Sequence, residues 1–389
     1  MRAEPTMADT AEPHLLDRLS SKFGPNIVAP VIAGIVAIVV SSVTLLAGGY
    51  NPVRAFTEIG KVLWSVESLV LILNRGAWYY VAGVAVAVGF KMGLFNIGAD
   101  GQYRLGALFA AYFGAKADLP PVLHVPYIIL IAMLVGGMWA AIPGVLKVTR
   151  GVNEVISTIM LNFVATGISA WLLGNYFRRE DGTLLTATKA IPISGRLPSL
   201  NRIFSAIGLK LPDGSVLQGY IVIAILVGIG YYILLFRSRF GFELRVSGEN
   251  PAAAKASGVN PKRMVLMTII LSGAIAGLIG IGPLLSDPIH FKYSDQFPFT
   301  LGFTGLSLAL LGRNHPVGIA FAAIIWHAIE RGTQPLTTKG FPQEIGKILQ
   351  GSFLLTAVIV FEVMRRRTQR EAVRDAAVKS SAQVEAVPA

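Results

Sequence analysis

The chain has 389 residues, of which 53% are hydrophobic and only 14% are charged, and its mean hydropathy is +0.60. Soluble domains carry about 25% charged residues, so this composition excludes an ordinary soluble fold and indicates a membrane protein with many spanning segments. The formal net charge of +12 does not indicate a nucleic-acid partner, because Lys and Arg cluster in loops and in the C-terminal tail. The sequence contains no cysteine, which excludes disulfides and thiolate metal sites.

Long apolar runs predict an all-α polytopic membrane protein with about ten transmembrane helices. The runs are continuous rather than alternating, which favours helices over the strands of a barrel. The eighth run is short enough to be re-entrant, and Asn74-Arg75 can mark the outer end of the second, which would leave 57–73 as a helix on the membrane surface. The predicted spans are approximately 28–48, 70–90, 94–115, 126–147, 153–176, 218–236, 265–285, 299–312, 316–331 and 345–364.

The predicted domains are a cytoplasmic N-terminal segment (1–27), a transmembrane domain (28–365) and a disordered cytoplasmic tail (366–389). The tail is predicted to be disordered because Ala, Glu, Lys and Ser mix there without periodicity. Placing the N-terminus inside puts most Lys and Arg in cytoplasmic segments, so both termini are predicted to be cytoplasmic, with a long outer loop at about 177–217. The basic loops are expected to meet anionic membrane lipid. The run Trp78-Tyr79-Tyr80 predicts an interfacial aromatic belt.

The first informative break in an apolar run is the segment 93–102, where glycines and polar residues interrupt the pattern. Asp100, Gln102 and Arg104 then enter an apolar stretch, where a charge at the bilayer centre costs about 3 kcal/mol, so these side chains are expected to face protein or water. One interpretation is a broken helix that forms part of a transport site. The other is a tight cytoplasmic turn, after which Asp100 and Arg104 pair on one helix face.

The second informative segment lies in the basic loop 237–264. Asn250 is a good N-cap, Pro251 suits the first helical turn, alanines follow, and Gly258 suits the left-handed position that ends a helix. These residues predict a short helix at about 250–258, which would be marginal in water unless a partner groove holds it. The alternative is an ordinary interfacial helix between two spans.

Polar residues recur in two other predicted spans. Asn153 can cap the fifth span, and Asn162 and Thr166 lie four residues apart on one of its faces, where they either bond to a neighbouring helix or line a pathway. Phe303 and Thr304 stand between two glycines in the short eighth span, where they either line a pathway or pack.

Four motifs carry a family resemblance that extends over about residues 28–365. They are Phe95-Asn96-Ile97-Gly98-Ala99-Asp100-Gly101-Gln102, Gly151-Val152-Asn153-Glu154-Val155-Ile156-Ser157-Thr158-Ile159-Met160-Leu161-Asn162, Gly248-Glu249-Asn250-Pro251 and Ala309-Leu310-Leu311-Gly312-Arg313-Asn314-His315-Pro316. As a set they resemble the permease subunits of ATP-binding-cassette (ABC) importers, in the branch that handles simple sugars, branched-chain amino acids and nucleosides. The chain is most similar to the nucleoside-type permeases.

The resemblance implies a subunit of the bacterial cytoplasmic (inner) membrane that works in a complex. Its partners would be an ABC ATPase subunit, a second permease subunit (a paralogue rather than another copy) and an extracytoplasmic substrate-binding protein. The short helix would be the coupling helix that docks on the ATPase, with Glu249, Asn250, Pro251, Ala254 and Gly258 as its coupling residues.

The sequence predicts no catalytic role for the chain itself. No Gly-x-x-x-x-Gly-Lys-[Ser/Thr] motif occurs, so ATP and Mg²⁺ would be used by the partner ATPase and this chain would bind no cofactor. The five histidines are scattered without metal-ligand spacing, so no metal site is predicted.

A neutral nucleoside requires no fixed counter-charge in its pathway. Side-chain amides would read the ring edges and ribose hydroxyls, and aromatic rings would stack on the base for about 1–3 kcal/mol each. The predicted pathway residues are Phe95, Asn96, Gln102, Asn162, Phe303 and Thr304. The alternatives are a sugar-specific ABC permease and an ion-coupled secondary transporter that works alone.

Overall fold

The computed structural model describes residues 25–179, 185–206, 208, 211–287, 291–342 and 344–385, and this part of the chain is helical with two isolated β-bridges. It divides into two compact units that are taken separately below. The central unit is Ile59–Gly332, and the terminal unit joins the chain up to Glu58 to the chain from Thr333 onward. Most of the predicted N-terminal segment 1–27 and part of the predicted loop 177–217 lie outside the described residues.

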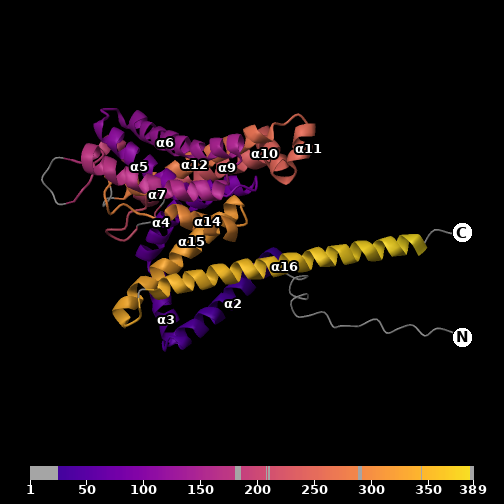
Figure 1. Cartoon of the computed structure of the whole chain (residues 1–389). Helices are drawn as coiled ribbons and strands as arrows, with labels where there is room; N and C mark the ends of the chain where they lie inside the picture. The colour runs from indigo at the N-terminus through magenta and orange to yellow at the C-terminus, as the bar shows by residue number, and fades with distance from the viewer. Residues whose placement is uncertain are drawn as a thin grey trace, which may run out of the picture. The chain divides into compact units, whose positions relative to one another are not determined.

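The central unit consists of helices joined mostly by short turns (Figure 1). Its first half contains α4 (Val66–Phe90), α5 (Ala99–Lys116), α6 (Pro121–Arg150) and α7 (Glu154–Leu172), and a π-helical turn extends α7 to Phe177. The second half contains α8 (Asn201–Ala206), α9 (Tyr220–Tyr232), α10 (Arg239–Glu249), α11 (Pro251–Ala256), α12 (Pro261–Gly277), α13 (Ile281–Ser286), α14 (Leu301–Leu311) and α15 (Pro316–Thr333). A second π-helical turn extends α9 to Arg237.

The terminal unit contains α2 (Pro25–Ala47), most of α3 (Pro52–Leu63) and α16 (Glu344–Glu385), and α2 packs along α16. Helix α16 has 42 residues and continues to Glu385. The structure therefore has a helix over 366–385, where the sequence predicts a disordered tail. Ala, Glu, Lys, Arg and Gln are good helix formers, so the tail can extend a helix although it lacks an apolar face.

Five of the described helices are long and apolar enough to cross a membrane: Val66–Phe90, Pro121–Arg150, Glu154–Phe177, Tyr220–Arg237 and Pro261–Ser286. They match the second, fourth, fifth, sixth and seventh predicted spans, and the shorter apolar helices Ile32–Ala47 and Leu301–Leu311 match the first and the eighth. The chain is thus a helical, multi-pass membrane protein. The total of ten spans and the cytoplasmic position of both termini stay predictions.

Helices α6 and α12 pack closely against each other within the central unit. A Cβ added to Gly277 would overlap the carbonyl oxygen of Ala132, and one added to Gly136 would overlap the carbonyl oxygen of Gly273. Small residues of this kind let two backbones approach, which is a common source of helix association inside membranes. The α6–α12 contact therefore depends on glycine at these positions.

The predicted aromatic belt at 78–80 is wrong. Trp78 is only 1% exposed and its indole nitrogen donates to Gln218 Oε1 at 3.2 Å, while Tyr79 is 8% exposed. Successive helical residues point about 100° apart, so three aromatic residues in a row cannot all face the lipid. In this helix two of them belong to the protein core.

The described parts of the segment 177–197 lie at the end of the central unit opposite α11 (Figure 1). Backbone hydrogen bonds attach them to α13 and to the chain that follows it: Leu197 N donates to Leu285 O of α13 at 2.9 Å, and Thr188 N donates to Tyr293 O at 2.9 Å. The long predicted loop is therefore ordered against the helix ends where it is described.

Candidate functional site

The segment between α4 and α5 is a turn followed by an irregular stretch. α4 ends at Phe90, Gly93 has a φ of +73°, and α5 begins at Ala99. The Leu94 amide donates to Gly89 O at 3.0 Å and closes the turn. The helix of the third predicted span therefore begins five residues later than predicted. The polar residues before Ala99 lie between two helices rather than within one.

Asn96 is the centre of a buried amide cluster in this stretch. Its Nδ2 donates to Gln102 Oε1 at 2.9 Å and to Ser272 Oγ at 2.8 Å. Its Oδ1 accepts from Gln102 Nε2 at 2.9 Å and from the Gly98 amide at 3.1 Å. Both hydrogens and both lone pairs of the Asn96 amide are thus used within the protein. Asn96 is 2% exposed, Gln102 1% and Ser272 fully buried.

Ser272 is the member of this cluster that the sequence did not reveal. It lies in α12, and its hydroxyl donates to the Ala85 carbonyl oxygen of α4 at 2.6 Å while accepting from Asn96. A single serine in an apolar helix gives no sequence signal for a partner 176 residues away. The cluster therefore joins three helices through contacts that only the fold reveals.

Asn162 attaches α7 to the start of α5. Its Oδ1 accepts from the Gly101 amide at 2.8 Å, and its Nδ2 donates to Ile97 O at 2.9 Å. A Cβ on Gly101 would lie 2.8 Å from the Ala165 Cβ, so the two helices meet closely here. Of the two interpretations offered for Asn162, the geometry shows interhelical hydrogen bonding.

Asp100 and Arg104 do not form an ion pair in the described part of the chain, contrary to the pairing expected on one helix face. Asp100 Oδ1 accepts from the Gly302 amide of α14 at 3.3 Å, and Arg104 Nη1 donates to Thr166 Oγ1 of α7 at 3.4 Å. Both charges therefore face protein, as the cost of exposing them to lipid requires.

The side chains of the other predicted pathway residues make none of the hydrogen bonds of the amide cluster. Phe95 is 44% exposed and contacts Phe90 edge-on, with ring centroids 5.0 Å apart. Phe303 is 43% exposed, and the Thr304 hydroxyl donates to Thr300 O of its own helix at 3.0 Å. The structure thus brings Asn96, Gln102 and Asn162 together near the α4–α5 turn and leaves the two phenylalanines half-exposed.

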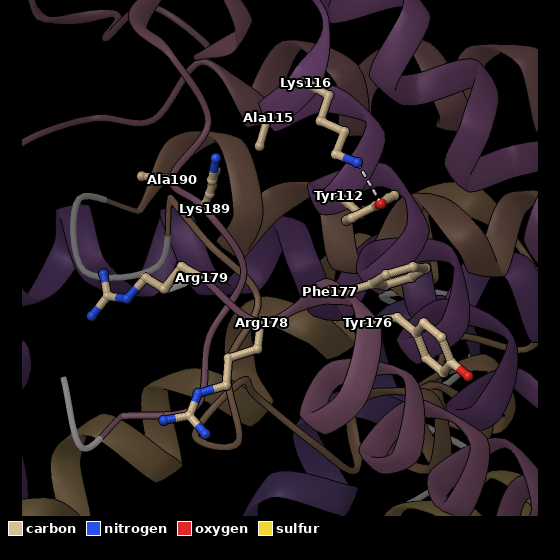
Figure 2. Close-up of a pocket in the computed structure, with 9 residues that line it drawn as sticks. All are labelled: Tyr112, Ala115, Lys116, Tyr176, Phe177, Arg178, Arg179, Lys189 and Ala190. Carbon is tan, nitrogen blue, oxygen red and sulfur yellow. Dashed lines mark hydrogen bonds between the residues drawn. The ribbon is translucent and has the colours of Figure 1, made fainter. Parts of the chain in front are cut away.

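Two cavities of about 570 Å³ occur in the described chain, and no predicted pathway residue lines either of them. One, of about 570 Å³, lies between α4, α9 and α15 and has an almost wholly apolar lining. The other has a similar volume and a basic, aromatic lining at the far end of α5 (Figure 2). No group of three metal-ligating side chains occurs among the residues described.

The predicted short helix is present as α11 (Pro251–Ala256). Asn250 Oδ1 accepts from the amides of Ala252 at 3.1 Å and Ala253 at 3.0 Å, and Gly258 has a φ of +81° after the last turn. These are the cap and the stop that the residue types predict. The helix projects from the end of the central unit (Figure 1).

One predicted coupling residue faces inward. Ala254 is fully buried, where it packs α11 against α10 and α12, whereas Ala252, Ala253 and Lys255 are exposed. A helix this short can present only part of its circumference to a partner. The surface that α11 offers is therefore formed by the residues beside Ala254 and not by Ala254 itself.

The last turn of α10, which leads into α11, touches the α4–α5 turn directly. A Cβ on Gly248 would lie 2.8 Å from Met92 Cα, so the two backbones are in contact. The Thr268 hydroxyl of α12 lies 3.2 Å from Met92 Sδ. Met92 is four residues before Asn96, so the end of α10 and the amide cluster belong to one packed region.

Two cations lie beside this contact. Lys91 Nζ and Arg245 Cζ lie 5.3 and 5.8 Å from the centroid of the Phe236 ring. Burial lowers the pKa of Lys91, and the neighbouring charge of Arg245 lowers it further. The ring attracts both cations, which offsets part of their repulsion and holds the α4–α5 turn next to α10.

The Gly151–Asn162 motif shapes the connection between α6 and α7. Gly151 has a φ of +69° after the last turn of α6, and Asn153 Oδ1 accepts from the Val155 amide at 2.8 Å to cap α7. Lys147 Nζ lies 2.5 Å from Glu154 Oε2 across the connection. The motif therefore fixes the angle at which α7 reaches the α4–α5 turn.

Sequence comparison relates the chain to known membrane transport proteins. A family model described as the permease component of the branched-chain amino acid transport system matches residues 68–358. The nucleoside ABC transporter permease protein NupB of Lactococcus lactis is 30% identical over 87% of this chain and 93% of its own. The guanosine ABC transporter permease protein NupP of Bacillus subtilis is 30% identical over 85% and 92%.

A glucose ABC transporter permease protein of Haloferax volcanii is also 30% identical, over 84% of this chain and 85% of its own. No solved structure matches the chain. The family match and the near full-length relatives cover the helices that hold the amide cluster and α11. The chain therefore belongs to the ABC transporter permease family, as a membrane transport subunit and not an enzyme.

Proposed function

We propose that the chain is the permease subunit of an ABC importer that carries nucleosides across the bacterial cytoplasmic membrane. The observation that carries the proposal is the similarity to NupB over nearly the full length of both chains. The capped and exposed α11 supports it, because a subunit without its own phosphate-binding motif needs a surface on which an ATPase can act.

The proposed topology has ten spans with α11 and both termini on the cytoplasmic side. The basic residues near α11 support this orientation, since cytoplasmic loops are rich in Lys and Arg. The ABC ATPase would contact α11 and would bind ATP and Mg²⁺. The extracytoplasmic binding protein would meet the opposite end of the central unit.

The proposed partner within the membrane is a second, paralogous permease. A second nucleoside ABC transporter permease protein of Lactococcus lactis, NupC, is also similar to this chain, which supports a pair of related subunits. Two different permeases would enclose the pathway between them, and the half-exposed rings of Phe95 and Phe303, with Thr304 beside the latter, are our candidates for its lining. The amides of Asn96, Gln102 and Asn162 would hold the helices behind that lining.

Force from the ATPase would reach this region through the contact between Gly248 and Met92. A displacement of α11 moves Gly248, and the backbone contact leaves Met92 no room to stay in place. Met92 leads into the stretch held by Asn96, which is bonded to α5 and α12. The cluster would therefore shift as one unit and alter the packing of α5 against α7 through Asn162.

Reconstitution in liposomes tests the proposal. The chain, the second permease and the ATPase are placed in the membrane, with ATP inside and the binding protein outside. Uptake of labelled uridine or adenosine should require all components and internal ATP. Uptake by this chain alone, driven by an ion gradient, would instead identify a secondary transporter.

The substrate needs its own comparison, because a glucose permease is as similar in identity as the nucleoside permeases. Labelled uridine, adenosine, guanosine and glucose are offered to the same liposomes and to the purified binding protein. The proposal predicts saturable uptake of nucleosides that unlabelled glucose does not reduce. Uptake of glucose alone would make the chain a sugar permease while leaving its role as an ABC subunit intact.

A further inference from the structure

The basic cavity at the far end of α5 is not used by the transport mechanism described above. It has a volume of about 570 Å³, and its lining comes from the last turn of α5, the π-helical turn after α7 and the segment around residue 189 (Figure 2). The end of α5 and the turn after α7, which line it, lie at the end of the central unit opposite α11 (Figure 1). The residues that carry the argument are Tyr112, Lys116, Phe177, Arg178, Arg179 and Lys189.

Four of these six side chains are cations. Lys116, Arg178 and Lys189 are exposed, and no carboxylate lines the cavity among the residues described, which exclude 180–184. Lys116 Nζ donates to Tyr112 Oη at 2.5 Å, which keeps its charge at the rim. Like charges gathered around a concave surface raise the local potential and attract an anion.

One wall of the cavity is aromatic. The Phe177 ring stacks on Tyr112, with centroids 3.8 Å apart and planes at 16°, and Phe109 meets Phe177 edge-on at 5.5 Å. Lys116 Nζ lies 4.2 Å from the centroid of Tyr112. These contacts fix one side of the cavity before any ligand enters, so less order has to be gained on binding.

The depth of the cavity is that of the membrane interface. It begins where the apolar span Glu154–Phe177 ends. Trp171 and Tyr176 near that end are 55% and 61% exposed, and their rings lie 4.9 Å apart. Exposed Trp and Tyr at the end of a span mark the level of the lipid headgroups.

A neutral nucleoside would gain little from four cations, whereas a phosphate would gain much. Arg178 supplies a planar guanidinium group, which matches the oxygens of a phosphate, and Lys116 and Lys189 supply further charge. We propose that this cavity binds the phosphate of an anionic phospholipid headgroup, with phosphatidylglycerol as the model ligand, and that Arg178 and Lys189 provide most of the selectivity.

Native mass spectrometry of the assembled transporter tests the site with phosphatidylglycerol and phosphatidylcholine at equal concentration. The variant is the double substitution Arg178→Gln and Lys189→Gln, since both side chains are exposed. Lys116 is not substituted, because its hydrogen bond to Tyr112 helps to form the aromatic wall of the cavity. The matched control is Arg202→Gln, an exposed cation of α8 that does not line the cavity.

The proposal predicts a preference for phosphatidylglycerol in the wild type and in the control. Each charge near a membrane surface is worth about fivefold in binding, so the double variant should bind phosphatidylglycerol about 25-fold more weakly. Binding of phosphatidylcholine should not change. Soluble glycerophosphoglycerol should compete only weakly, because it lacks the chains that hold a lipid at this depth.

Four results would overturn the lipid site. Equal binding of the two lipids by the wild type would remove its basis, as would an unchanged affinity in the double variant. Displacement of the lipid by millimolar inorganic phosphate would assign the cavity to soluble phosphate. If the double variant kept its lipid but lost stimulation by the binding protein, the cavity would be a docking surface for an acidic protein.

Discussion

Asn96 uses every hydrogen-bonding position of its side chain inside the protein, and this determines how the amide cluster is best understood. A side chain that reads a substrate must leave a donor or an acceptor for it. Asn96 leaves neither in this conformation. The cluster is better suited to holding helices in register than to recognising a nucleoside.

The variant Asn96→Ala tests this role. It leaves both ends of the Gln102 amide without their partner, and each unsatisfied buried group costs about 1–3 kcal/mol. The thermal unfolding midpoint of the purified complex should fall and transport should fall with it. Asn175→Ala, which changes an exposed asparagine of the π-helical turn, is the control and should do neither.

A different outcome for Asn96→Ala would reverse the interpretation. If the unfolding midpoint stayed at the wild-type value while the KM for uridine rose, the amide would be contacting the substrate.

Asn250 provides a second test at the scale of one residue. Asn250→Ala removes the acceptor for two amides of α11 and should cost about 1 kcal/mol, which a six-residue helix cannot easily tolerate. Asn250→Asp keeps the acceptor and places a negative charge at the positive end of the helix. ATP-driven uptake should fall in the first variant and persist in the second; equal loss in both would show that the amide nitrogen itself contacts the ATPase.

Helix α11 shows how far local sequence signals predict an element. Asn250, Pro251 and Gly258 predict its start and end, and the structure places the helix at Pro251–Ala256. The burial of Ala254 depends on packing against α12, and Gly248 contacts Met92, which is more than 150 residues earlier in the chain. No local pattern predicts either feature.

The polar stretch before α5 could not be interpreted from local sequence signals alone. Its glycines predict a break, but the same residues are compatible with both a broken span and a turn. Only the end of α4 at Phe90 and the start of α5 at Ala99 decide for the turn. Ser272 and the continuation of α16 were missed because an isolated serine and a polar tail carry no periodic signal.

The exposed face of α11 can be tested apart from its folding. Lys255→Glu reverses a charge on an exposed side chain, so the helix should form while its contact with the ATPase weakens. Nucleoside uptake and stimulation of the ATPase should both fall severalfold or more, with an unchanged unfolding midpoint. Arg202→Glu reverses an exposed charge at the other end of the unit and should leave both activities intact.

The contact between α6 and α12 can be tested with one methyl group. Gly277→Ala would push a Cβ into the Ala132 carbonyl oxygen, and overpacking of this kind costs about 1–3 kcal/mol. Gly167→Ala in α7 adds the same group where nothing lies within 4 Å. The unfolding midpoint should fall for the first variant alone; equal midpoints would show that the two helices can separate without loss.

At the scale of the whole molecule, the central unit has two functional ends. One end carries α11, in contact with the α4–α5 turn and through it with the amide cluster. The other carries the segments that are hydrogen-bonded to α13 and to the chain that follows it, together with the basic cavity. The account requires that work done at the first end changes access to the pathway between them, while the chain itself hydrolyses nothing.

Single-cysteine variants test that requirement most directly, because the chain contains no cysteine of its own. Lys255→Cys is crosslinked to a cysteine on the ATPase in the reconstituted transporter, and uridine uptake is measured before and after reduction of the link. The account predicts that crosslinking stops ATP-driven uptake, that reduction restores it, and that Arg202→Cys forms no such link. Two results would contradict it. One is that a membrane-impermeant thiol reagent labels Lys255→Cys from the outside only, and the other is full uptake while the crosslink is in place.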